Sequence, residues 1–401
     1  MMRISTQQVF DNGVFNMLRN QYDAYRLQNQ LSTGRRVVTP ADDPVAAAQA
    51  LVVEQKKSVN QQFLDNQGNA AGQLKELDVL MNSVSGILMA VKDRWVEAGN
   101  GSYSDHELDD ISMDVRGKFA EIFGIANNSD ATGFYRFAGY KAATRPFVSV
   151  NNVVSYRGDS GERLLQVETA RFIPVSFSGH EFFEAIPTGN GYFVANPGNS
   201  YGLGSTSNTG TGVISNGSML SSAFDGNTYS IEFTAPGQYD LYVNGTLTSS
   251  ANPYVAGTSI PLGGAEVSID GTPNVGDTFE VSPSREESIF ATLNKFLSLL
   301  ASGHASETEF RNGMLRVGAS LDQALQHILD NRAVVGARLS ELEDLTNLGK
   351  DMRVEYETQI SDLVDLDYNK YISDLSKNQL QLQASQQAFV RVTNLSLFNY
   401  I

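Results

Sequence analysis

Hydrophobic residues recur in alternating steps of three and four along the first third of the chain. One stripe consists of Leu74, Leu77, Met81, Val84, Leu88, Val91 and Trp95. A second stripe consists of Leu108, Ile111, Val115, Phe119 and Ile122. This spacing is typical of α-helices that pack along a heptad seam. We predict long helices over about 45–98 and 105–128, each with one face buried against other helices.

A similar pattern returns in the last third of the chain. Residues 289–300 carry one apolar stripe, a loop is expected at 302–306, and a nearly unbroken register runs from Met314 to Leu366. A helix from about Glu307 to the C-terminus would span on the order of 130 Å, because each helical residue rises about 1.5 Å. No compact globule encloses such a helix. We expect it to pack along the helices of the first third.

The middle of the chain has a hydrophobic period of two. Runs such as "TYSIEF" and "YDLYV" alternate, and every proline except Pro40 and Pro44 lies between Pro146 and Pro283. Short alternating runs separated by Gly and Pro indicate antiparallel strands joined by turns. The predicted fold class is therefore α+β, a long antiparallel helical rod with coiled-coil seams and an inserted antiparallel β domain. We predict three domains: 1–44 with 367–401, 45–146 with 285–366, and the insert 147–284.

The first helical segment is interrupted at residues 31–50, "LSTGRRVVTPADDPVAAAQA". A helix does not run through Pro40, and the residue before each proline is driven toward extended geometry. Pro44 fits the first turn of a new helix, with Asp42 or Asp43 as its cap. This stretch therefore predicts a joint between two helices.

A second interruption is expected near Asp365 and Asp367, because the helical register shifts after Leu366. Beyond it the seven-residue line passes through Tyr368, Leu375, Leu382 and Phe389. Together the two interruptions define a predicted joint of Gly34, Pro40, Asp42, Asp43, Pro44, Asp365 and Asp367.

The two terminal segments have a helical period with amides or small residues where a dimer seam has leucine. Their seam positions form the predicted assembly interface: Phe10, Val14, Met17, Gln21, Gln28, Leu31, Leu375, Gln379, Leu382, Gln386 and Phe389. Such seams bury little apolar area, whereas ordering each residue costs about 1 to 2 kcal/mol. We predict that the ends become ordered helices only when several subunits share the burial. The alternative is that both ends are ordinary antiparallel core helices with a few polar positions.

Composition excludes several classes of protein. The net charge of −16 argues against a nucleic-acid partner, which requires a concentrated positive surface. No apolar run approaches the roughly 20 residues of a membrane span, and the start "MMRISTQQVF" lacks the apolar core of a secretory signal. The absence of cysteine excludes disulfides and thiolate chemistry.

No motif predicts catalysis, a cofactor or a metal site. The four histidines, His106, His180, His304 and His327, lack metal-ligand spacing. The run "DLDYNK" at 365–370 lacks the glycine and glutamate of a calcium loop and is best interpreted as part of a helix. Glycine-rich stretches of the insert lack a phosphate-binding fingerprint. We therefore expect the protein not to be an enzyme.

Several of these stretches resemble a known family. "LSTGRRVVTPADDPVAAAQA" resembles the N-terminal signature of bacterial flagellins and their relatives. "NRAVVGARLSELE" and "SDLVDLDYNKYISDLSKNQLQLQASQQAF" resemble the C-terminal blocks of the same superfamily. The resemblance covers roughly the first 140 and the last 115 residues. The start "MRIST", the ending "LSLFNYI" and the central "GTPNVGDTFEVSPS" are more similar to the hook–filament junction members of this superfamily than to filament flagellins.

The resemblance implies a structural subunit of the extracellular flagellum, exported without a cleavable signal peptide. It implies terminal helices that form the inner tube, with the joint as the connection to the next layer. The implied partners are other copies in a ring, the first hook-associated protein on one side and flagellin on the other, with a cytoplasmic export chaperone and no nucleic acid or membrane. Two alternatives remain: a filament flagellin subunit, or a surface β insert with glycan-binding or adhesive activity.

Overall fold

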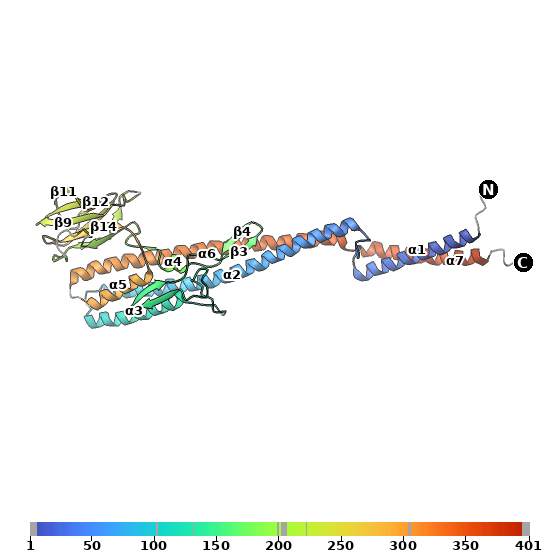
Figure 1. The fold of residues 1–401 in the computed structure, drawn as a ribbon, viewed down its shortest axis with the longest axis horizontal. Helices are drawn as coiled ribbons and strands as arrows, with labels where there is room; N and C mark the ends of the chain where they lie inside the picture. The colour runs from blue at the N-terminus through green and yellow to red at the C-terminus, as the bar shows by residue number, and fades with distance from the viewer. Residues whose placement is uncertain are drawn as a thin grey trace. The chain divides into compact units, whose positions relative to one another are not determined.

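The computed structural model describes residues 6–101, 103–130, 132–198, 200–201, 207–221, 223–303 and 306–394. Within these ranges the helices are α1 (Thr6–Thr33), α2 (Pro44–Ala98), α3 (Asp105–Ala126), α4 (Gly179–Phe183), α5 (Ile289–Ser302), α6 (Glu307–Val364) and α7 (Tyr368–Asn394) (Figure 1). The α+β fold class, with long helical segments on both sides of an inserted antiparallel β region, is confirmed.

The chain divides into two compact units, which share the long helices α2 and α6. The first unit comprises the residues up to Gln67 and those from Asp344 onward, and the second comprises Gly68–Glu343. The first contains α1, α7 and the adjoining ends of α2 and α6. The second contains α3, α5, the remainder of α2 and α6, and the strands. The division into three domains that the sequence suggests stays a prediction.

The helical part of the second unit is held together by the predicted heptad stripes. Leu74, Leu77, Met81, Val84, Leu88 and Val91 of α2 are all buried. The apolar faces of α3, α5 and α6 are buried with them, and the Trp95 indole donates a hydrogen bond of 2.8 Å to the Met314 carbonyl. Ser104 and Glu107 form a capping box at the start of α3, which satisfies free N–H groups of its first turn.

The β region consists of two parts, a division that the period-two pattern did not reveal. The first part has the hairpins β1 (Phe147–Val150) with β2 (Val153–Tyr156) and β3 (Leu164–Glu168) with β4 (Arg171–Pro174). These hairpins and α4 cover the helices through a cluster of buried rings contributed by Phe137, Phe147, Phe182, Phe183 and Phe290. The second part is a β sandwich.

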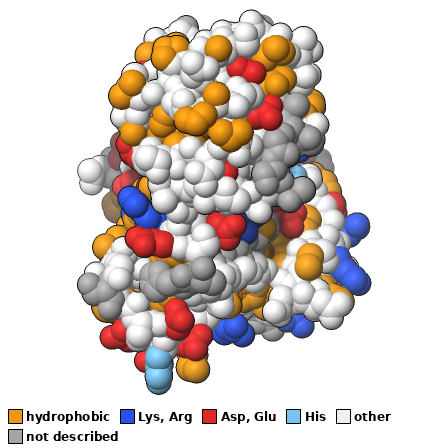
Figure 2. All heavy atoms as spheres, turned by 90° about the vertical axis from the view of Figure 1, so that its left-hand side faces the viewer, with side chains coloured by type: hydrophobic (Ala, Val, Ile, Leu, Met, Phe, Trp, Pro, Cys, Tyr) orange, Lys and Arg blue, Asp and Glu red, His pale blue; other side chains and the backbone are white. Residues whose placement is uncertain are grey.

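The sandwich has two antiparallel sheets. One has the order β11 (Thr246–Pro253), β10 (Gln238–Val243), β9 (Tyr229–Ala235), β14 (Thr278–Pro283), β6 (Phe193–Pro197). The other has the order β12 (Ser259–Leu262), β13 (Ala265–Asp270), β7 (Val213–Ile214), and β8 (Ser218–Met219) also pairs with β13. Alternate residues face inward, so Ile231, Phe233, Val267, Phe279 and Val281 form one core. Figure 2 shows the surface hydrophobic side chains of the sandwich in separate groups between polar ones.

Two short strands join the sandwich to the helices. β5 (Ile186–Pro187) pairs with β15 (Glu286–Glu287). We call this strand pair, together with the two residues Thr188 and Arg285 that adjoin it, the neck. The Thr188 amide donates to the Arg285 carbonyl over 2.9 Å, and the Arg285 amide donates to the Thr188 hydroxyl over 3.0 Å. The chain therefore enters and leaves the sandwich at one place.

Candidate assembly site and the joint between helices

The predicted joint is a short loop between α1 and α2 that contacts the link between α6 and α7. Gly34 ends α1 with a φ of 69°, and a Cβ added there would lie 2.8 Å from the Tyr368 hydroxyl. Only glycine adopts this left-handed geometry without strain. The Leu366 amide donates to the Gly34 carbonyl over 3.1 Å, and Arg35 and Asp365 form an antiparallel bridge. The structure therefore brings the two predicted interruptions together.

Arg36 connects the ends of three helices. Its guanidinium donates to the Asp43 carboxylate over 2.9 Å and to the Leu363 carbonyl over 2.6 Å. Its amide donates to the Val364 carbonyl over 2.7 Å, and its own carbonyl accepts from the buried side chain of Gln30 over 2.6 Å. The sequence interpretation missed Arg36, because its partners at the end of α6 lie more than 320 residues away in the chain.

The two aspartates of the joint have different roles. Asp42 accepts hydrogen bonds from the Val38 amide and from the amide and hydroxyl of Thr39, which closes the turn that contains the exposed Pro40. Asp43 accepts from the Ala46 amide over 3.0 Å and so caps α2, whose first residue is Pro44.

The pKa of each of these carboxyl groups is lowered. Burial raises the pKa of Asp42, but the hydrogen bonds from Thr39 and Val38 outweigh that effect. At Asp43 the hydrogen bond from the Ala46 amide and the Arg36 guanidinium lower the pKa. Both groups therefore favour the folded joint in their ionised forms.

Acid is expected to weaken the joint. The pKa of Asp43 in the folded protein lies below its ordinary value of 3.8. Ionised Asp43 therefore stabilises the folded joint fully above pH 3.8, and this stabilisation is lost as the pH falls through the folded pKa. Asp43→Asn keeps an acceptor for the cap but removes the charge, so its melting temperature should depend less on pH between about 5 and 2.5 than that of the wild type. Identical pH profiles by circular dichroism would contradict this role.

The link between α6 and α7 consists of Asp365, Leu366 and Asp367. Asp365 accepts from the Ser361 hydroxyl over 2.6 Å, and Asp367 accepts from the Asn369 amide over 3.1 Å at the start of α7. The interpretation of "DLDYNK" as helical is correct only from Tyr368 onward. The Asp365 amide still donates to the Ser361 carbonyl over 2.8 Å, but the Leu366 amide donates to Gly34 and Asp365 bridges to Arg35, so the helix ends here.

A small apolar core supports the joint from inside. Val37, Ala46, Ala50 and Val364 are buried together, and Ala47 and Leu363 pack against them. The alanines of "PVAAAQA" let the start of α2 approach the end of α6 closely. The loop, the link and both long helices thus form one packed element within the first unit.

The predicted assembly residues lie on α1 and α7, which pack antiparallel to each other. The rings of Phe10 and Phe389 are 5.1 Å apart, and Asn20 donates to the Ser385 hydroxyl over 3.3 Å. The half-buried members of the set are Val14, Met17, Leu31, Leu375, Leu382 and Phe389. Phe10 and the four glutamines, Gln21, Gln28, Gln379 and Gln386, are exposed.

A second apolar stripe on α1 was missed by the sequence interpretation. Phe15, Leu18, Tyr22 and Tyr25 are 59% to 69% exposed and follow steps of three, four and three. On α7, Ile372, Leu380 and Val390 are also exposed. The heptad spacing of the α1 stripe was visible in the sequence, but the stripe runs beside the seam that was chosen. This pair of helices presents apolar side chains that one chain does not cover.

The chain is similar to flagellar proteins at both ends and along its full length. The bacterial flagellin N-terminal helical region matches residues 4–142, and the bacterial flagellin C-terminal helical region matches residues 319–401. Flagellar hook-associated protein 3 of Escherichia coli (strain K12) is 28% identical over 397 residues, with 99% of each chain covered. The same-named protein of Salmonella typhimurium is 27% identical, also with 99% of each covered.

Solved structures agree with these relatives. The flagellar junction protein FlgL from Legionella pneumophila has a TM-score of 0.69 at 27% identity, covering 79% of this chain and 100% of that one. FlgL of Xanthomonas campestris has a TM-score of 0.69 at 26% identity, covering 77% and 99%. The chain belongs to the bacterial flagellin superfamily, and along its full length it is similar to flagellar hook-associated protein 3. The flagellin superfamily assignment made from the terminal signatures is thereby confirmed.

Some of the stretches singled out in the sequence fall on residues that the structure does not describe. The ending "LSLFNYI", most of "MRIST" and His304 lie outside the described residues. His106, His180 and His327 are each placed next to a different partner: Asp110, Glu184 and the Glu181 carbonyl. Across the described ranges no group of three or more His, Asp or Glu side chains is arranged for a metal ion, and no helix has the length and apolar content of a membrane span.

The exposed apolar stripes predict that the α1–α7 pair is the least stable of the described helical parts. Neither described α1 nor described α7 contributes a buried hydrophobic side chain to the core, so little burial offsets the entropy of ordering them. Limited proteolysis of the monomer should remove both terminal segments first and leave about 45–365 intact. Mass spectrometry of the fragments provides the measurement, and protected termini would mean that the α1–α7 pair is stable by itself.

Proposed function

We propose that this chain is the junction subunit that connects the hook to the flagellin filament of a bacterial flagellum. The observation that carries the proposal is similarity over 99% of the chain to flagellar hook-associated protein 3. It favours the junction over a filament flagellin subunit, because the relatives matched along the full length carry the hook-associated name. The flagellar junction protein from Legionella pneumophila supports the same assignment.

The α1–α7 pair is proposed as the part that assembles. Its exposed apolar stripes would be buried against other copies in a ring, and that burial would offset the cost of ordering the ends. The joint would then connect this inner layer to the outer helices through Gly34, Pro40, Asp42, Asp43, Pro44, Asp365 and Asp367. Arg36 joins this set, since it connects the ends of α1, α2 and α6.

The neighbours proposed for the ring are the first hook-associated protein on one side and flagellin on the other. We further propose export to the cell exterior without a cleavable signal peptide, and a cytoplasmic chaperone that shields the exposed terminal stripes before export. The role is structural and requires no catalytic group, cofactor or metal.

Deletion of the gene tests the proposal. Cells should make hooks that carry no filament and should release flagellin into the medium, because exported flagellin has nothing on which to assemble. Electron microscopy and an immunoblot of the medium provide the two measurements. Filaments that are merely shorter or altered in composition would instead indicate a filament subunit.

A further inference from the structure

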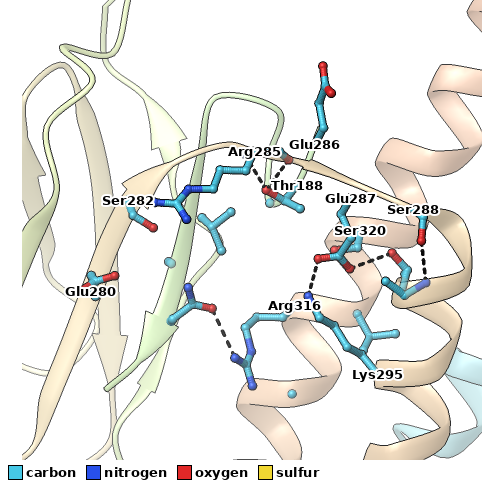
Figure 3. Close-up of a pocket in the computed structure, with 18 of the residues that line it drawn as sticks. Thr188, Glu280, Ser282, Arg285, Glu286, Glu287, Ser288, Lys295, Arg316 and Ser320 are labelled. Atoms are coloured by element: carbon cyan, nitrogen blue, oxygen red, sulfur yellow. Dashed lines mark hydrogen bonds and ion pairs between the residues drawn. The ribbon is translucent and has the colours of Figure 1, made fainter. Parts of the chain in front are cut away.

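The second unit contains a large pocket where the neck, the sandwich and two helices meet. It has a volume of about 1020 Å³ and is lined by β6, β14, the neck, α5 and α6. Figure 3 shows side chains of the neck, the sandwich and the two helices around it. Its size is at the upper end of pockets that hold small organic ligands, which are about 300 to 1000 Å³.

Six charged side chains line the pocket, three acidic and three basic. Two of the three glutamates already have partners within the protein, and the third points away from the pocket. Glu280 accepts hydrogen bonds from the amide and the hydroxyl of Ser200. Glu287 forms an ion pair with Lys295 and accepts from Thr292. Glu286 is exposed and points away from the pocket in Figure 3. The charge of Glu287 is therefore paired with Lys295, and the oxygens of Glu280 are occupied by the Ser200 donors although the carboxylate keeps its charge.

Two guanidinium groups remain. Among the residues that the structure describes, the Arg285 side chain has no hydrogen-bond or ion-pair partner, and Arg316 has one, the Asn196 side-chain oxygen at 3.3 Å. Figure 3 shows both groups on the side of the neck that faces the sandwich. Both side chains are exposed at the edge of the pocket, and the protein around Arg316 displaces part of its water and lowers its pKa. A guanidinium in this position is stabilised by an anion that enters the pocket.

The other lining groups match a polyhydroxylated ligand. The hydroxyls of Ser282, Ser298 and Ser320 line the pocket and have no hydrogen-bond partner among the described residues. Val194 and Val317 supply apolar wall. A phosphate ion would satisfy the arginines but leave most of the volume and these hydroxyls unused. A sugar ring with a carboxylate would use the arginines, the serine hydroxyls and the volume of the pocket. Arginine binds a carboxylate through two parallel hydrogen bonds, and sugar hydroxyls can both donate hydrogen bonds to serines and accept them.

We propose that this pocket binds an acidic sugar, with its carboxylate held by Arg285 and Arg316. The site combines the neck with α6, so it is a property of the whole second unit and not of the insert alone. It would give an exposed flagellar protein a saccharide-binding activity in addition to its junction role. The inference does not depend on the proposed junction function, since the pocket lies within one chain.

Calorimetric titration of the full-length protein with galacturonate, and with galactose as the uncharged counterpart, tests this site. We expect galacturonate to bind at least tenfold more tightly than galactose. Arg285→Gln and Arg316→Gln should each weaken galacturonate binding at least tenfold. Arg311→Gln is the matched control, because Arg311 lies on the same helix, is exposed and does not line the pocket; it should change binding less than twofold.

A measurement on the wild-type protein guards against variants that fold poorly. Phenylglyoxal modifies accessible arginines, and peptide mass spectrometry should show that galacturonate protects Arg285 and Arg316 but not Arg311. Inorganic phosphate that binds as tightly as galacturonate would overturn the sugar assignment. Absence of binding, or binding that neither arginine variant weakens, would overturn the site.

Discussion

Leu18→Asp/Tyr22→Asp is expected to leave cells with hooks and almost no filaments. Both residues lie in the exposed stripe of α1, which the proposed ring would bury. Burying an unpaired carboxylate costs several kcal/mol, so the copies should no longer associate. We expect at least a tenfold decrease in filaments per cell and a corresponding rise in flagellin in the medium, measured in a deletion strain that expresses the variant.

The control for this experiment adds the same charge elsewhere on α1. Asn16→Asp/Asn29→Asp places two carboxylates at exposed polar positions outside the stripe and should support nearly normal filament numbers. Circular dichroism should show that both double variants retain the helical content of the wild type. Normal filaments with the stripe variant would refute a role of this surface in assembly.

Phe183→Ala is expected to destabilise the second unit by about 3–5 kcal/mol, the range for deleting a fully buried aromatic side chain. The Phe183 ring centre lies 5.1 Å from that of Phe137, 5.3 Å from Phe147, 4.7 Å from Phe182 and 5.9 Å from Phe290. Its removal leaves a cavity where the hairpins and α4 meet the helices. Urea denaturation followed by fluorescence provides the measurement.

Phe172→Ala is the matched control for this variant. Phe172 lies on the hairpin strand β4 and is 50% exposed, so its loss should change the free energy of unfolding by no more than about 0.5 kcal/mol. Equal effects of the two substitutions would mean that the ring cluster does not stabilise the fold.

The sequence predicted the features that depend on local pattern. A repeat of three and four residues specifies a helix whatever it contacts, so the long helices were found close to their observed bounds. Pro40, Pro44 and Gly34 mark chain breaks by their own backbone chemistry, and the joint was found for that reason.

Features that depend on distant residues were not predicted. The bonds of Arg36 with the end of α6 require the two long helices to be placed first. The division of the β region depends on which strands pair, since alternation is the same in a hairpin that covers helices and in a sandwich. The pocket combines Thr188, Arg285 and Arg316, and no motif links residues so far apart.

The neck makes the sandwich a replaceable module. Thr188 and Arg285 are directly hydrogen-bonded, so removing the 96 residues between them would leave ends that a short turn can join. Any substitute domain whose own termini are adjacent fits the same attachment without moving a helix. The sandwich could therefore be exchanged or lost between lineages while α1 and α7, the helices proposed to assemble, keep their sequence.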